Sequence, residues 1–297
     1  MTHSPFSRAP LRVAVTGGTS GLGLALVEAF AARGDHVAFV ARDAGRVGRV
    51  ADAIAGSHGI VGDVAKKDDV HAVALQIGGA LGGLDVLIHN ASSLGPVPLA
   101  LLADTECEDF QAALATNVLG PFRLTKALLG LLAASARESK AEGRRALVVN
   151  VTSDAAVHPY AGWGAYGASK AALAHMSSIW HEEVAPHGIA VVAIDPGDMD
   201  TPLHAAAVPD ADPATLKRPR DAAREIVDRI DRERAGGVRA QLDSRTAGPS
   251  AQLDSRTVGP TAQLDSPTAG PSAQFDSDAA RLPHLDLHTA VPAGSAE

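Results

Sequence analysis

Tyr166 and Lys170 are spaced so that they can act together on one proton. They stand four residues apart in the segment 165–173, AYGASKAAL, and residues at that spacing share one face of a helix. A tyrosine ordinarily has a pKa near 10, but a neighbouring ammonium group favours its ionised form. We therefore expect the pKa of Tyr166 to be lowered toward neutral pH. Its phenol can then give a proton to a carbonyl oxygen or take one from an alcohol.

A serine that can complete this chemistry lies thirteen residues before Tyr166. Ser153 ends the apolar run 145–153, RALVVNVTS, which has the composition of a buried strand. A hydroxyl at that place can hydrogen-bond a carbonyl oxygen and the negative charge that develops on it. The other tyrosine of the chain, Tyr160, has Gly164 four residues on instead of a lysine. We therefore assign Tyr160 to the wall of the pocket.

A glycine-rich stretch near the N-terminus has the features of a phosphate-binding loop. TGGTSGLG, residues 16–23, follows a strand pattern at 11–17 and leads into a helical pattern at 23–34. Glycines permit a tight turn and close approach of a pyrophosphate, and the helix N-terminus supplies free N–H groups. In this strand–loop–helix context the stretch predicts dinucleotide binding. The residues assigned to the contact are Gly17, Thr19, Ser20, Gly21, Leu22 and Gly23.

The end of the second apolar run, 36–42, indicates which dinucleotide to expect. Many NAD-binding folds place an acidic residue there for the ribose 2′-hydroxyl. Here Arg42 comes first and Asp43 follows. Because a guanidinium suits a 2′-phosphate, we expect NADP(H) to be preferred. NAD(H) stays open, since Asp43 could act as the acidic selector.

Short apolar runs alternate with helical patterns along residues 11–242. Six runs lack the strict alternation of a half-exposed strand: 11–17, 36–42, 58–64, 84–92, 145–153 and 189–197. Such runs are typical of parallel strands covered on both faces. The longest helical pattern lies between them at about 106–136. Repeated β–α units predict a single α/β domain of the Rossmann type, with a doubly wound parallel sheet and right-handed crossovers.

The order and spacing of these motifs resemble the short-chain dehydrogenase/reductase family in its single-domain form. The resemblance rests on TGxxxGxG at 16–23 and YxxxK at 166–170, and it covers about residues 11–242. The family's catalytic serine, tyrosine and lysine match Ser153, Tyr166 and Lys170, and the lysine also binds the nicotinamide ribose. The family's fourth catalytic residue, an asparagine that helps to hold a proton-relay water, matches Asn117 in ATNVLGPF.

The same resemblance implies further contacts with the cofactor. GDV at 62–64 matches the family's Asp-Val pair beside the adenine, and HNAS at 89–92 stands where the family usually has NNAG. A Pro-Gly turn and a threonine after the run 189–194 match residues beside the nicotinamide and its carboxamide. The contacts implied are Asp63, Val64, Asn90, Ala91, Pro196, Gly197 and Thr201, together with Tyr166 and Lys170.

The resemblance implies an oxidoreductase that moves a hydride between NADP(H) and a carbonyl compound or secondary alcohol. An alternative is a catalytically idle NADP(H)-binding sensor or scaffold, which the presence of all four catalytic positions disfavours. An epimerase or dehydratase of the extended type is disfavoured by the TGxxxGxG spacing and by the lack of a large C-terminal substrate domain. The resemblance also implies a homodimer or homotetramer, often packed through the long helix and the Tyr-Lys helix.

Composition argues against several other function classes. The 297 residues carry a net charge of −8 with scattered Lys and Arg, so we expect no nucleic-acid or membrane partner. A single cysteine, Cys107, excludes an internal disulfide and a thiolate zinc site. The 12 histidines are dispersed, so we expect no metal. Because the N-terminus lacks the apolar run of a signal peptide, we expect a cytoplasmic protein that acts on a small molecule.

The C-terminal part has a different character. From Ala240 an 11-residue unit recurs three times and then in part, as AQLDSRTAGPS, AQLDSRTVGPT, AQLDSPTAGPS and AQFDSD. Each unit holds a Gly-Pro pair and one large apolar residue, which disfavours both a helix and a β-solenoid. We expect a flexible N-terminus at 1–10, a Rossmann domain at 11–242 and a disordered tail at 243–297. A last edge strand at 237–242 stays open.

Overall fold

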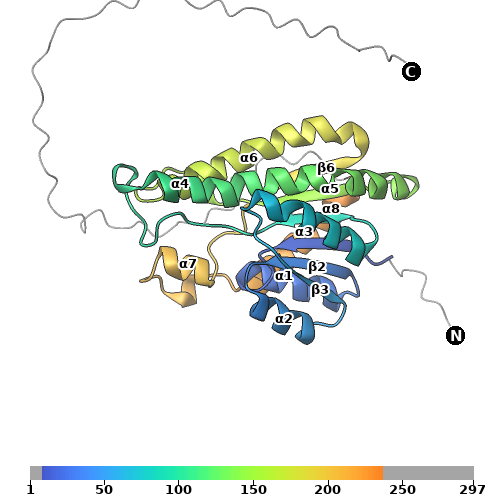
Figure 1. The fold of residues 1–297 in the computed structure, drawn as a ribbon, viewed down its shortest axis with the longest axis horizontal. Coiled ribbons are helices and arrows are strands. Elements are labelled where there is room, and N and C mark those ends of the chain that lie inside the picture. The colour runs from blue at the N-terminus through green and yellow to red at the C-terminus, as the bar shows by residue number, and fades with distance from the viewer. Residues whose placement is uncertain (1–8, 237–297) are drawn as a thin grey trace, which may run out of the picture. The chain divides into compact units, whose positions relative to one another are not determined.

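Six apolar segments form the strands of one parallel sheet in the computed structural model, which describes residues 9–236 (Figure 1). The strands are β1 (Arg12–Thr16), β2 (His36–Ala41), β3 (Ser57–Val61), β4 (Val86–His89), β5 (Ala146–Val151) and β6 (Ile189–Ile194). The α-helices are α1 (Gly21–Ala32), α2 (Ala44–Ala53), α3 (Lys67–Leu81), α4 (Cys107–Leu114), α5 (Gly120–Glu138), α6 (Gly164–Val184), α7 (Pro202–Ala207) and α8 (Pro219–Arg234). Short turns are η1 (Leu102–Asp104), η2 (Ala115–Leu119), η3 (Lys140–Glu142), η4 (Asp154–Ala156), η5 (Ala185–His187) and η6 (Pro213–Thr215). The predicted doubly wound α/β fold is confirmed.

The strand order places a topological switch between β1 and β4. The order across the sheet is β3-β2-β1-β4-β5-β6. Val13 of β1 therefore lies beside Val37 of β2 on one side and beside Val86 of β4 on the other. In open α/β sheets, ligands bind outside the carboxyl ends of the strands at such a switch. The glycine loop after β1 and the HNAS segment at the end of β4 both lie at this point.

Successive residues of the central strands face two separate cores, because side chains alternate between the faces of a sheet. On one face, Val13 and Val15 pack with Phe30 of α1 and Ile230 of α8. On the other face, Ala14 belongs to a core built with helices α3 and α5. Both faces are therefore covered, which explains why the strands lack an alternating polar pattern.

The long helix expected at about 106–136 is two α-helices joined by a π-helical turn. Helix α4 ends at Leu114, the turn η2 follows, and α5 begins at Gly120. The sequence pattern predicts one continuous helix here, so this turn is a difference from the expectation. A π-turn widens the helix by one residue and is often found at functional sites. Asn117 lies in this turn, and its side chain is completely buried.

Within the described residues, one stretch, Cys107–Glu138, is long and apolar enough to cross a membrane by length and composition alone. The core helix of a soluble protein passes the same test. Here Leu124, Leu128 and Leu132 of this stretch are buried in the core on one face of the sheet. The expectation of no membrane partner stays a prediction.

Several expectations concern residues outside the described part of the chain. They are the flexible N-terminus, of which only residues 9 and 10 are described, the edge strand at 237–242 and the tail at 243–297. The domain boundaries given for these segments therefore stay predictions.

His89, the last residue of β4, is a deeply buried histidine. It is 3% exposed, and its Nε2 lies 2.8 Å from Oγ1 of Thr125 on α5. Burial lowers the pKa of His89 to about 3, because the charged ring is not hydrated there. The folded protein therefore keeps this ring neutral at pH values where an unfolded histidine is charged.

We predict that His89 makes the protein sensitive to mild acid. Its folded pKa lies below the unfolded value of about 6.5, so the unfolded chain binds the extra proton as the pH falls and stability is lost. The two values correspond to about 2 kcal/mol between pH 7 and pH 5. Urea unfolding at both pH values measures this loss. His89→Asn should reduce it by about that amount, and His58→Asn, at an exposed position on β3, should not. An unchanged loss in His89→Asn would contradict the prediction.

Candidate active site

The glycine loop between β1 and α1 is shaped for close approach of a ligand. Gly17 has φ of 72°, a left-handed conformation that glycine adopts without strain, and its N–H donates to the carbonyl of Val40 at 2.8 Å. A Cβ added to Gly23 would collide with the carbonyl oxygen of Gly17 and with Nδ2 of Asn90. Ser20 is exposed at the start of α1, and its side chain does not cap the helix. The first turn of α1 can therefore offer N–H groups to a phosphate.

Not every residue of the predicted loop can face a ligand with its side chain. Thr19 is partly exposed, and Gly21 lies beside Thr201, since an added Cβ would be 3.1 Å from Thr201 Cγ2. Leu22, in contrast, is buried in the core with α8. A contact between Leu22 and a cofactor would therefore have to use its backbone.

Asn90 and Thr16 hold the glycine loop against the end of β4. Asn90 Nδ2 donates to the carbonyl oxygens of Thr16 at 3.0 Å and of Gly17 at 3.3 Å. The Thr16 hydroxyl accepts from the backbone N–H groups of Asn90 and Ala91 at 3.0 and 3.1 Å. The resemblance singled out Asn90 and Ala91 but not Thr16. The signal available in the sequence is a threonine at the end of the apolar run, immediately before the glycines.

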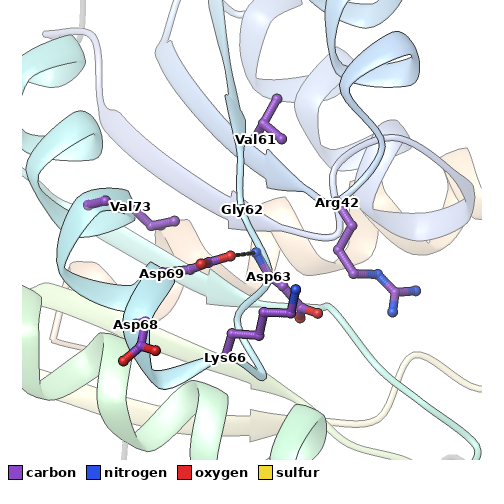
Figure 2. A pocket seen from close by; sticks show the side chains of 9 residues that line it. Arg42, Val61, Gly62, Asp63, Lys66, Asp68, Asp69 and Val73 are labelled. Atoms are coloured by element: carbon purple, nitrogen blue, oxygen red, sulfur yellow. Dashed lines mark hydrogen bonds between the residues drawn. The ribbon is translucent and has the colours of Figure 1, made fainter.

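Arg42 and Asp63 line one cavity of about 370 Å³ beside the carboxyl ends of β2 and β3. Figure 2 shows the Arg42 side chain at this cavity, with Asp63 and Lys66 across from it. Asp43 is the N-cap of α2, where its Oδ1 accepts from the N–H of Arg46 at 2.8 Å. Val64 is buried in the core that helices α3 and α5 form on one face of the sheet. The acidic residue beside Arg42 is thus engaged by the helix that follows it.

Lys170 lies almost completely inside the protein, one helical turn after Tyr166. It is 2% exposed, and Nζ donates to the carbonyl oxygen of Val151 at 2.8 Å. The same Nζ lies 5.4 Å from the centre of the Tyr166 ring. The carbonyl at the end of β5 therefore fixes the ammonium group beneath the tyrosine.

The electrostatics of this pair differ from the sequence expectation. The pKa of Tyr166 is raised to about 12, mainly by burial and less strongly by Asp195 and Asp154, while Ser153 and Ser92 act in the lowering direction. Burial also lowers the pKa of Lys170 to about 8, against a raising effect of Asp195. The expectation of a lowered tyrosine pKa is therefore wrong for the protein alone. The reason is the loss of hydration in the buried site, which favours the neutral phenol.

Ser153 follows the end of β5, and its hydroxyl is engaged by protein groups. Ser153 Oγ donates to Oδ1 of Asp154 at 3.0 Å and accepts from the N–H of Ala155 at 3.2 Å. The Tyr160 hydroxyl donates to the second oxygen of Asp154 at 2.8 Å. Tyr160 also packs edge-on against Trp163, which packs edge-on against Tyr166. The two tyrosines of the chain thus belong to one aromatic row.

All four side-chain hydrogen bonds of Asn117 go to protein groups. Oδ1 accepts from Ser92 Oγ at 3.1 Å and from the Ser93 N–H at 2.8 Å. Nδ2 donates to the Ser93 carbonyl and to Ser169 Oγ, each at 2.8 Å. Ser169 in turn donates to the carbonyl of Tyr166 at 2.6 Å. Asn117 therefore ties the π-turn to the loop after β4 and to helix α6. Nothing in the sequence pattern indicates the contacts of Ser92 and Ser169 with Asn117.

The segment after β6 returns to the glycine loop. Pro196 is buried, and Gly197 has φ of 74° with its N–H donating to Asp195 Oδ1 at 2.9 Å. The Thr201 hydroxyl accepts from the N–H of His204 at 3.2 Å, which caps helix α7. The structure therefore places Arg42 and Asp63 at the cavity beside β2 and β3, and it places Ser153 after β5 and Tyr166 and Lys170 on α6. Gly21 of the glycine loop lies beside Thr201.

The arrangement fits a nicotinamide dinucleotide. The loop has a glycine cradle that a single Cβ would fill, and Arg42 presents a cation at the neighbouring cavity. In the part of the chain that the structure describes, no group of three or more His, Cys, Asp or Glu side chains could hold a metal ion.

Comparison with known proteins gives matches over most of the described residues. The model of the short chain dehydrogenase family matches residues 12–212. A Sinorhizobium fredii protein described as an uncharacterized short-chain type dehydrogenase/reductase is 34% identical over 192 residues, which is 64% of this chain but only 33% of that protein. Glucose 1-dehydrogenase of Gluconobacter oxydans is 30% identical over 231 residues, 74% of this chain and 83% of that enzyme.

Solved structures agree with these matches. The 3-ketoacyl-(acyl-carrier-protein) reductase of Brucella melitensis, complexed with NADH, is 28% identical with a TM-score of 0.68, covering 77% of this chain and 93% of that one. A short chain dehydrogenase of Escherichia coli CFT073, complexed with NADPH, is 27% identical with a TM-score of 0.64, covering 72% and 87%.

We predict that Gly23→Ala weakens dinucleotide binding by roughly 100-fold, the equivalent of about 2.7 kcal/mol. The added methyl group would occupy the place of the Gly17 carbonyl and the Asn90 amide, so the loop must open. Titration of the protein with NADPH, followed by fluorescence, measures the change. Gly48→Ala is the control, because Gly48 is exposed on α2 with nothing within 4 Å of an added Cβ. It should bind normally and gain about 0.5–1 kcal/mol in stability. Normal binding by folded Gly23→Ala would contradict the prediction.

Proposed function

The chain belongs to the short-chain dehydrogenase family, and on that premise we propose that it transfers a hydride between NADP(H) and a carbonyl compound or secondary alcohol. Proteins of this family are oxidoreductases that use a nicotinamide cofactor on small-molecule substrates. The observation that carries the proposal is the surroundings of Tyr166. Ser153 acts to lower the pKa of its phenol, and the buried Lys170 Nζ lies 5.4 Å from the centre of its ring.

The nicotinamide, when bound, supplies the hydride in carbonyl reduction and accepts it in alcohol oxidation. In reduction, the Ser153 hydroxyl hydrogen-bonds the carbonyl oxygen and the Tyr166 phenol gives it a proton. In oxidation, the ionised phenol takes the proton of the alcohol. Lys170, held by the Val151 carbonyl, favours the ionised phenol and binds the nicotinamide ribose. Asn117 supports the proton relay from within the π-turn.

NADPH oxidation against a panel of aldehydes and ketones tests this function. Wild-type protein should turn over at least one of them, and Tyr166→Phe should lose about 100-fold or more in kcat because the proton donor is gone. Binding of NADPH, measured separately by fluorescence, should change little. If neither protein turns over while both bind NADPH, the proposal fails and an idle sensor or scaffold accounts better for the binding site.

The preference for NADP(H) over NAD(H) is a second part of the proposal. It is supported by Arg42, whose side chain lies at the cavity beside β2 and β3, and by Asp43, whose carboxylate caps α2. A guanidinium at this place can pair with a 2′-phosphate in two hydrogen bonds. An acidic side chain engaged as a helix cap is less free to bind a ribose hydroxyl.

We predict that Arg42→Ala raises the Kd of NADPH about tenfold or more and leaves that of NADH nearly unchanged, because a hydrogen bond to a charged group is lost with only one of them. Fluorescence titration with both nucleotides measures the ratio. Arg49→Ala, an exposed arginine of α2 that does not line the cavity, should leave both constants in place. Equal binding of NADH and NADPH by the wild type, unaffected by Arg42→Ala, would overturn the cofactor preference.

We also propose that the protein forms a homodimer or homotetramer through α5 and α6. Phe122 of α5 is 39% exposed, and its ring centre lies 6.0 Å from that of Trp180 on α6. Leu119 and Ile179, on the same two helical stretches, are exposed as well. Large exposed apolar side chains often mark an interface. A monomeric mass by light scattering would exclude this assembly.

A further inference from the structure

Three aromatic side chains form a row that leads from the buried ring of Tyr166 to the protein surface. The Trp163 ring lies edge-on to Tyr166 with 5.7 Å between ring centres, and Tyr160 lies edge-on to Trp163 at 6.4 Å. Tyr166 is buried, Trp163 is half-buried and Tyr160 is exposed. The whole chain has only two tryptophans and two tyrosines. Three of these four side chains therefore stand in one row at the proposed site.

An apolar cluster with members from four segments includes Tyr166. Its buried members are Leu94, Ala155 and Tyr166, and its partly buried members are Leu99, Trp163, Ala206 and Ala207. The two leucines lie in the loop after β4, whereas Ala206 and Ala207 belong to helix α7. The partly buried members keep some apolar surface in contact with solvent. That surface lies beside the residue that the proposed function places at the substrate oxygen.

The same segments expose further large apolar side chains. Leu102 is 62% exposed and lies against the start of α6, since a Cβ added to Gly164 would collide with it. Val157, just after η4, and Leu203 of α7 are exposed as well. We call Leu102, Val157 and Leu203 the apolar rim. Exposed apolar side chains that gather in this way often mark a ligand-binding groove.

The polar side chains that follow β5 are engaged with one another. The Tyr160 hydroxyl donates to one oxygen of Asp154 at 2.8 Å, and the Ser153 hydroxyl donates to the other at 3.0 Å. A sugar or another polyol needs protein partners for its hydroxyl groups, because buried polar groups without partners are penalised. Such a substrate would have to compete with the bonds of Asp154. An apolar group would leave the bond between Tyr160 and Asp154 intact.

The place of the substrate oxygen determines where the rest of the substrate lies. In the proposed reaction this oxygen is hydrogen-bonded to the Tyr166 phenol, and both substituents of the carbonyl carbon begin within two bonds of it. A substituent therefore meets the side chains that pack around Tyr166, and these are apolar. Removal of an apolar substituent from water against such side chains is favourable.

We propose that the substrate is an apolar ketone or the corresponding secondary alcohol, with an aryl or long alkyl group that lies against Trp163 and the apolar rim. This rests on the proposed oxidoreductase function. Trp163 is then a specificity-determining residue, because paired aromatic rings attract each other beyond the burial of their area. In reduction the carbonyl carbon accepts the hydride from the reduced nicotinamide, and the carbonyl oxygen accepts the proton of Tyr166. Alcohol oxidation is the reverse.

A series of methyl alkyl ketones tests the substrate class with wild-type protein and NADPH. From acetone to methyl butyl ketone, kcat/KM should rise about three- to fourfold for each added CH₂ group. Methyl butyl ketone should also be preferred about tenfold or more over its analogue in which a hydroxyl replaces the terminal methyl group. Equal or better reduction of the hydroxylated analogue would overturn the proposal.

Trp163→Ala tests the residue that lies next to Tyr166 in the aromatic row. The ratio of kcat/KM for acetophenone to that for acetone should fall about tenfold, mainly through KM, because uniform binding is lost. Trp163→Phe keeps an aromatic ring and should retain most of the ratio. Leu75→Ala is the control, since Leu75 is an exposed leucine of α3 outside the cluster, and it should leave the ratio in place. An unchanged ratio in folded Trp163→Ala would refute the proposal.

Binding of acetophenone to the protein with NADP⁺, measured by calorimetry, separates the substrate class from the reaction. Its Kd should be about tenfold higher in Trp163→Ala than in the wild type. If no ketone is reduced while acetophenone binds in this Trp163-dependent way, the apolar site stands and the proposed oxidoreductase function fails. If hydroxylated ketones are reduced as well as apolar ones, the function stands and the substrate class is refuted.

A second copy of the chain is the other occupant to test for at the apolar rim. In that case Leu102→Ser would lower the mass measured by light scattering and leave the ratio of acetophenone to acetone reduction unchanged, which would overturn the proposal. The proposal predicts the opposite pair of results, an unchanged mass and a lower ratio.

Discussion

The hydrogen-bonding requirement of one completely buried amide, that of Asn117, fixes the geometry on which the candidate catalytic residues depend. An unpaired buried polar group is costly, and Asn117 meets this constraint only when three segments are in place: the π-turn that carries it, the loop at Ser92 and Ser93, and helix α6 at Ser169. Ser169 in turn donates a hydrogen bond to the Tyr166 carbonyl, so the backbone of Tyr166 is held by the same network. A shift of α6 along the sheet would break these bonds, so the Tyr-Lys face of α6 is held in register with the carboxyl ends of β4 and β5.

The loop after β4 couples the two ends of the site. Asn90 holds the glycine loop through the carbonyls of Thr16 and Gly17, and two residues later Ser92 and Ser93 hold Asn117. The phosphate-binding loop and the proton-transfer residues are thus fixed to the same short segment. This is a consequence of the strand order, because β4 is the neighbour of both β1 and β5 and its carboxyl end lies between theirs.

Sequence alone predicts the strands, most helices, the glycine-rich loop and the Tyr-Lys pair, because each depends on residues close together in the chain. Apolar runs give the strands, glycines the turn, and a spacing of four gives the pairing of Tyr166 with Lys170 on α6. The π-turn at Asn117 is missed, since its extra residue only shifts the phase of the apolar pattern, and the segments before and after it each still have a helical pattern. Thr16 and Ser92 are missed because their partners come from other segments. The direction of the Tyr166 pKa is missed for a related reason, since burial depends on the packing of the whole fold.

Burial acts on Tyr166 and Lys170 in opposite directions, and this decides what the rest of the site has to supply. It raises the pKa of the phenol to about 12 and lowers that of the amine to about 8, so in both cases the uncharged form gains. An ionised phenol beside a charged lysine is therefore disfavoured by desolvation, and Asp154 and Asp195 disfavour the phenolate further. Donors placed at the phenol act against these effects. Ser153 and Ser92 act to lower the pKa of the phenol, and the Val151 carbonyl holds the ammonium beneath the ring. The chemistry proposed for Tyr166 depends on these neutral hydrogen-bonding groups as much as on the lysine.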